Sequence, residues 1–104
     1  MRQIPEEMLR AIQGRFHELI RARAAEHVAG REFVLPELTP LLTSSEPKAW
    51  FPVPGMYGGF SYWLEGDGEQ TRLMTESWSR VVDGSGQRHE VTAAGFKLVA
   101  EGFV

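Results

Sequence analysis

The chain has 104 residues, of which 42% are hydrophobic and 24% are charged. This length predicts a single domain over residues 1–104, and the apolar fraction excludes an intrinsically disordered chain. Cysteine is absent, which excludes disulfides, iron–sulfur clusters, thiolate zinc sites and thiol nucleophiles. A net charge of −3 offers no global attraction for nucleic acid. Because no apolar run is long enough to span a membrane and the first residues do not resemble a secretory signal, we expect a soluble cytoplasmic protein.

A long amphipathic helix is predicted over residues 4–29. Its apolar residues recur at spacings of three and four and form one stripe, made of Ile4, Met8, Leu9, Ile12, Phe16, Leu19 and Ile20. Pro5 suits the first helical position, and Gly30 suits the position after the last turn. Gly14 costs about 1 kcal/mol relative to Ala inside a helix. The fold therefore either tolerates Gly14 or uses it for the close approach of another element.

Residues 31–47 connect this helix to the rest of the chain. Three prolines exclude a long regular element here, namely Pro36, Pro40 and Pro47. The segment is nevertheless too apolar for a free linker, since it contains Phe33, Val34, Leu35, Leu38, Leu41 and Leu42. We predict a packed crossing segment with one helical turn near Thr39 to Ser44.

An antiparallel meander is predicted next, because short alternating runs are separated by turn residues. Its strands are residues 48–53, 59–65, 70–82 and 87–91. Pro52 places the first strand at an edge or an end of the sheet. The Asp67-Gly68 pair predicts a two-residue type I′ turn, which would set Trp63 opposite Arg72.

The last predicted element is a short helix from Ala93 to Glu101, with Thr92 as its N-cap and with Phe96 and Val99 turned inward. The order of elements predicts an α+β fold. In that fold the long N-terminal amphipathic helix packs on a three- to four-stranded antiparallel meander, and a short C-terminal helix follows.

The two faces of the predicted sheet differ in composition. Alternation along the strands places Phe60, Tyr62, Leu64 and Leu73 on one face, which we assign to the core. The opposite face carries Trp63, Met74, Trp78 and Val82, with Arg72, Glu76 and Arg80 between them. A half-solvated sheet normally turns polar residues outward. The tryptophans are therefore covered by the connector or the C-terminal helix, or they form a binding surface.

Tryptophan, methionine and arginine are the residue types typical of interface anchors. We therefore predict a small binding domain that acts through an aromatic-rich sheet face, made of Trp63, Arg72, Met74, Trp78 and Arg80. A protein partner or a second copy of the chain is the expected occupant. A ligand pocket with aromatic walls is the alternative for the same face.

A second candidate site lies between the Gly-rich turn around Gly58 and the predicted hairpin at residues 83–86. A small-ligand or enzyme site there would use Tyr57, Gly58, Gly59, Glu76, Arg88 and His89. Exposed backbone N–H groups of such a turn can hold an anion, although the spacing of a nucleotide-binding fingerprint is missing. His89 and Glu90 point to opposite faces of one strand, so they do not form a local catalytic pair. No catalytic residue is assigned, and the sequence favours binding over catalysis.

No metal ion or cofactor is expected. His17 and His27 are ten residues apart on one helix, which separates them by roughly 280° around its axis. The chain contains no HExxH pair, and none of its serines lies in a GxSxG elbow.

Residues 78–100 consist of a strand, a Gly-rich turn, a second strand and then Thr92-Ala93-Ala94-Gly95 opening a helix. This order resembles the wing and following helix of winged-helix regulators. The resemblance implies nucleic-acid binding, with Arg80 and Arg88 as the wing cations that reach the DNA backbone. The preceding segment departs from that family, because two strands and a Gly-rich turn stand where a helix-turn-helix belongs. The acidic net charge also disfavours nucleic acid, so this is the weaker alternative.

Overall fold

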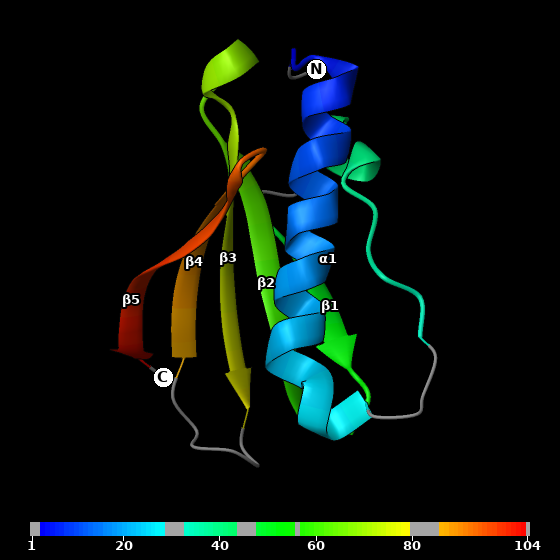
Figure 1. Ribbon diagram of the computed structural model, residues 1–104, viewed down its shortest axis with the longest axis vertical. Coiled ribbons are helices and arrows are strands. Elements are labelled where there is room, and N and C mark those ends of the chain that lie inside the picture. Colours follow the sequence, from blue (N-terminus) through cyan, green and yellow to red (C-terminus); the bar gives the residue numbers. More distant parts are fainter. Residues whose placement is uncertain (1–2, 29–32, 44–47, 56, 80–85, 104) are drawn as a thin grey trace.

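A computed structural model describes residues 3–28, 33–43, 48–55, 57–79 and 86–103 of the chain (Figure 1). One long helix, α1 (Glu6–Val28), lies against one face of a five-stranded antiparallel sheet. The strands pair in chain order and are β1 (Ala49–Val53), β2 (Gly58–Glu65), β3 (Arg72–Ser79), β4 (Gly86–Thr92) and β5 (Gly95–Phe103). Two short 3-10 turns, η1 (Thr39–Leu42) and η2 (Gly68–Gln70), precede β1 and β3. The α+β prediction is confirmed, with five strands instead of three to four.

The core lies between α1 and the sheet face that the sequence assigns to it. Phe60, Tyr62, Leu64 and Leu73 are all buried, together with the apolar stripe of the helix. Phe16 of α1 contacts Phe60 edge-on, with ring centroids 6.0 Å apart, and Tyr62 at 5.0 Å. Burial of each such side chain stabilises the fold by about 1.5–3 kcal/mol. Gly14 has open space around its Cα, so the fold tolerates it and uses it for no close contact.

The connector packs on the helix-bearing side of the sheet. Phe33 stacks on Phe51 of β1 with ring centroids 6.0 Å apart. The buried Leu38 donates its backbone N–H to the Gln13 Oε1 of α1 over 2.8 Å. The predicted helical turn is confirmed as η1. Among the described residues, no helix combines the length and the apolar character needed to cross a membrane.

The β2–β3 connection is longer than the predicted two-residue turn. Glu65 pairs with Arg72, and Trp63 pairs with Met74 instead of Arg72. The loop between them closes through η2, where the Thr71 hydroxyl donates to the Gly68 carbonyl over 2.8 Å. The Gly68 N–H donates to the Gln3 carbonyl over 2.9 Å, which ties the loop to the start of the chain. Because the register differs from the prediction by two residues, every side chain keeps its predicted face.

The predicted C-terminal helix is wrong, because the chain after Thr92 forms the strand β5. Thr92 pairs with Gly95 across a two-residue turn, and its hydroxyl accepts the Ala94 N–H over 3.3 Å. Thr92 therefore accepts a backbone N–H two residues later, as an N-cap would, but this bond lies in the turn of a β-hairpin and not at the start of a helix. Gly95 and Gly102 weaken a helix in this segment, whereas phenylalanine, leucine and valine suit a strand that can pair with β4.

Candidate functional site

The sheet face opposite α1, called the outer face here, carries aromatic and charged side chains from all five strands. The strand pairings place on it Trp50, Trp63, Met74 and Trp78, together with Glu65, Arg72, Glu76, Arg88, Glu90 and Lys97. Lys48, which precedes β1, joins them through its contact with the Trp63 ring. The helix and the described part of the connector both lie on the other side of the sheet. The predicted C-terminal helix, which was one possible cover, is β5 and extends the sheet instead.

Two of the tryptophans stack on each other across β2. The ring centroids of Trp50 and Trp78 are 6.1 Å apart, and the ring planes differ by 28°. Their partners on β2 are Ser61 and Gly59, the smallest residues on the outer face of that strand. Trp50 is still 47% exposed, whereas Trp78 is half-buried.

The third tryptophan is held by polar neighbours. Trp63 donates its indole N–H to the Glu65 Oε2 over 2.9 Å. The Lys48 Nζ lies 4.4 Å from the centroid of the Trp63 ring, a cation–π contact worth about 0.5–1 kcal/mol at an exposed site. Met74 is the cross-strand partner of Trp63 and extends the apolar surface toward Glu90.

Ion pairs surround this aromatic group. Arg88 Nη2 lies 2.6 Å from Glu76 Oε1 across β3 and β4. Arg72 lies 3.4 Å from Glu65 and 3.5 Å from Glu90, and Lys97 lies 3.5 Å from the same Glu90 carboxylate. These side chains are partly exposed, so each pair stabilises the fold by less than about 1 kcal/mol. Positive and negative groups alternate, which leaves the outer face close to electrically neutral.

Four of the five predicted anchors therefore lie together on β2 and β3, namely Trp63, Arg72, Met74 and Trp78. The fifth, Arg80, lies outside the described residues, as does Val82. Trp50 and Lys48 belong to the same surface, although neither was among the predicted anchors. Alternation in the 48–53 segment, where Trp50 is flanked by Ala49 and Phe51, is the signal that would have placed Trp50 on this face.

The Gly-rich turn has a packing role in the structure. A Cβ at Gly58 would lie 2.0 Å from the Trp78 carbonyl oxygen, and a Cβ at Gly59 would lie 2.2 Å from that of Phe51. Both glycines pair within the sheet and let its backbones approach closely. Tyr57 is 75% exposed and adopts a positive φ of 51°.

The titratable residues proposed for the second site lie on two sides of the sheet. Glu76 and Arg88 pair on the outer face, whereas His89 is buried beneath α1 and shares its face with Val91, as predicted. The His89 ring lies edge-on to Phe96, with ring centroids 6.2 Å apart. The structure thus brings Glu76 and Arg88 together and separates both from His89.

His89 has an unusual environment for a histidine. Burial and, to a lesser extent, the positive charge of Arg23 lower the pKa of His89 below its ordinary value of 6.5. The Nδ1 atom of His89 and the Nε atom of Arg23 are buried and have no hydrogen-bond partner. The described residues contain no group of three histidine or carboxylate side chains that could hold a metal ion.

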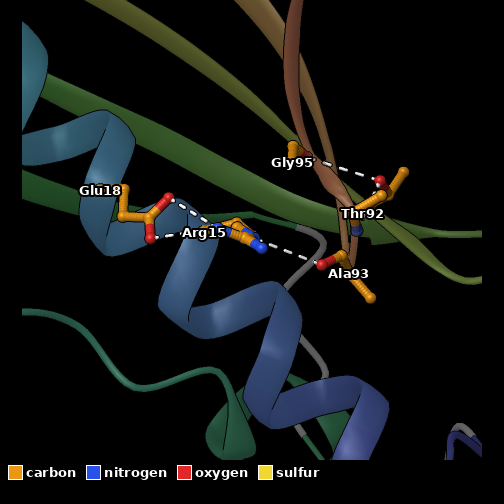
Figure 2. A network of polar contacts seen from close by, with 6 residues as sticks. Arg15, Glu18, Thr92, Ala93 and Gly95 are labelled. Atoms are coloured by element: carbon orange, nitrogen blue, oxygen red, sulfur yellow. Dashed lines mark hydrogen bonds and ion pairs between the residues drawn. The ribbon is translucent and has the colours of Figure 1, made fainter.

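The turn between β4 and β5 docks on α1. Figure 2 shows Arg15, which pairs with Glu18, donating its Nε–H to the Ala93 carbonyl over 3.3 Å. A cavity of about 290 Å³ beside this turn is lined by Glu90, Thr92, Ala94, Gly95, Phe96 and Lys97. None of the tryptophans lines this cavity, although it shares Glu90 and Lys97 with the outer face.

The structure does not contain the helix that the winged-helix resemblance implies after the wing. The pattern requires a helix after the wing, and this segment is the edge strand β5. Arg80, one of the two wing cations, lies outside the described residues. Comparison of the chain with protein-family models, with curated proteins and with solved structures finds no match in any of the three.

Proposed function

We propose that this protein is a small binding domain that engages a protein partner through the outer face of its sheet. Trp50, Trp63, Met74 and Trp78 are the anchors in this proposal. The single observation that carries it is the stacked pair of Trp50 and Trp78, with Trp50 47% exposed, on the face that α1 does not cover. Tryptophan is the residue type most enriched among side chains that dominate binding energy.

The distribution of aromatic residues supports this proposal. All three tryptophans of the chain lie on the outer face. The buried core is instead built from phenylalanine, tyrosine, leucine, isoleucine, valine and alanine. Because the core needs none of the tryptophans, a role in recognition accounts for their shared position.

The charge and shape of the outer face favour a protein partner over a nucleic acid or a small molecule. Arg72, Arg88 and Lys97 each face a carboxylate, whereas binding to a nucleic acid requires cations that are free to neutralise phosphates. Small-molecule sites are concave and mostly apolar, and none of the three tryptophans lines the cavity beside the β4–β5 turn. A nearly neutral aromatic surface with a rim of ion pairs is typical of protein interfaces.

The test compares proteins retained by the immobilised wild-type chain with those retained by Trp50→Ala, Trp78→Ala and Val34→Ala. Val34 is 88% exposed on the connector and lies away from the outer face, so it is the matched control. We expect a partner whose dissociation constant, measured with the purified pair, rises at least about tenfold for both tryptophan variants and stays unchanged for Val34→Ala. Equal retention by all four chains contradicts the proposal, and so does unfolding of Trp78→Ala.

A further inference from the structure

A buried histidine and an arginine lie together between the second half of α1 and the sheet, on the side opposite the outer face. His89 of β4 is only 7% exposed, and its Nδ1 atom has no hydrogen-bond partner. The Nε atom of Arg23, on α1, is also buried and also lacks a partner. Arg23 is close enough for its charge to act on the His89 ring. Because buried polar groups in folded proteins are nearly always paired, these two atoms call for an acceptor.

The described residues around this pair do not supply that acceptor. Thr75, the cross-strand partner of His89, donates its hydroxyl to the Ser61 carbonyl over 2.8 Å. Glu101 is the carboxylate of β5 on this side of the sheet, since it pairs with Gln87, and it is exposed. Among the described residues, no carboxylate lies within ion-pair distance of the arginine. A partly buried positive charge therefore lacks a counter-ion in this part of the fold.

Exposed apolar side chains border the pair on β5. Phe96 and Leu98 point to the α1 side of the sheet, because their cross-strand partners are the buried residues Val91 and His89. Beyond the β4–β5 turn, β5 diverges from the second half of α1 (Figure 1). Phe96 is consequently 40% exposed and Leu98 is 47% exposed. An apolar surface open to solvent thus lies directly beside the two unpaired nitrogen atoms.

We propose that Arg23 and His89 form the anion-binding end of a site for a monocarboxylate, whose apolar body lies along Phe96 and Leu98. A carboxylate accepts from both the guanidinium Nε–H and an imidazole N–H, and such charge-assisted hydrogen bonds are stronger than neutral ones. It also supplies the negative charge that Arg23 lacks, whereas a water molecule would leave the buried charge uncompensated. An apolar wall with a few convergent polar groups is the usual composition of a small-molecule site.

Phe96 controls access to the polar end. Its ring lies edge-on to His89, with ring centroids 6.2 Å apart, and covers the imidazole from the β5 side. Exposed side chains change rotamer within nanoseconds, so movement of Phe96 uncovers the histidine without moving the backbone. The site does not depend on the proposed partner binding, since it lies on the other side of the sheet from the tryptophans.

The test is calorimetric titration of the full chain with two probes, benzoate and hexanoate, whose apolar bodies differ in shape. We expect saturable binding, with a dissociation constant that rises at least about tenfold in Arg23→Gln and in His89→Gln. Arg21→Gln is the matched control, because it removes the same charge from an exposed position two residues away on α1. It should leave the affinity unchanged.

Two uncharged probes separate anion recognition from apolar contact. Benzyl alcohol and hexanol keep the apolar bodies and lack the charge, so they should bind at least about tenfold more weakly than the acids. Absence of saturable binding for both carboxylates overturns the proposal. Equal affinities of the acids and the alcohols also overturn it, and so does an equal loss of affinity in Arg21→Gln and Arg23→Gln.

A measurement on the wild type remains decisive if His89→Gln does not fold. Benzoate should shift the NMR signals of the His89 ring and raise the pKa of His89, because a nearby negative charge favours the imidazolium form. The signals of His17, whose ring nitrogen already contacts the Pro36 carbonyl, should not move. Equal shifts of the two histidines, or no shift of His89, contradict the assigned site.

Discussion

Trp50 and Trp78 stack over β2, with their ring centroids 6.1 Å apart, although they belong to strands that do not pair with each other. The contact is possible because the intervening outer-face positions are Gly59 and Ser61. Two large rings thus use the space left by two small residues. The pair forms on the face opposite the core, so its contribution to folding and its contribution to binding can be measured separately.

The first prediction concerns stability. Trp50→Ala should lower the free energy of unfolding by about 1 kcal/mol, the usual worth of an aromatic pair at a partly exposed site. Phe16→Ala should lower it by about 3–5 kcal/mol, because Phe16 is completely buried between α1 and the sheet. Urea unfolding of the two variants beside the wild type measures both values. Equal losses would show that the outer face is part of the folding core.

The second prediction compares two glycines. Gly58→Ala should destabilise the fold by about 1–3 kcal/mol, because the new Cβ would lie 2.0 Å from the Trp78 carbonyl oxygen. Gly14→Ala should stabilise it by about 1 kcal/mol, since this helical position has open space and Ala has the higher helix propensity. Thermal and urea unfolding report both changes. A stable Gly58→Ala variant would contradict the close approach of β2 and β3.

The third prediction concerns pH. Because burial and the Arg23 charge lower the pKa of His89, the folded state favours the neutral imidazole. The unfolded chain binds the proton more readily, so the contribution of His89 to stability is complete above the unfolded pKa of about 6.5. It is lost as the pH falls from there toward the lower folded pKa. Urea unfolding between pH 8 and pH 5.5, where most carboxylates stay ionised, should therefore show decreasing stability.

His89→Gln should remove most of this pH dependence, whereas His17→Gln is the matched control and should retain it. A ring nitrogen of His17 lies 2.6 Å from the Pro36 carbonyl of the connector. Arg23→Gln should weaken the dependence, since the nearby positive charge contributes to the low pKa of His89. An unchanged pH profile in His89→Gln would assign the effect to another group.

Local patterns in the sequence determined the faces of the helix and the strands. The three-four spacing placed Phe16 in the core, and strict alternation separated Tyr62 from Trp63 on opposite sides of the sheet. These predictions succeeded because the side-chain periods of helices and strands follow from backbone geometry alone. They also survived the incorrect β2–β3 register, since a shift of two residues keeps every side chain on its face.

Only the tertiary structure decided what residues 93–101 form and what surrounds the site. Thr92 can cap a helix or close a hairpin, and the choice depended on the edge of β4 with which this segment pairs. The meeting of Trp50 with Trp78 and the burial of His89 near Arg23 also depend on residues far apart in the chain. The sequence by itself therefore determined which way side chains point, because that is local geometry. Their neighbours were decided by strand pairing and helix packing, because those contacts form only when distant segments come together.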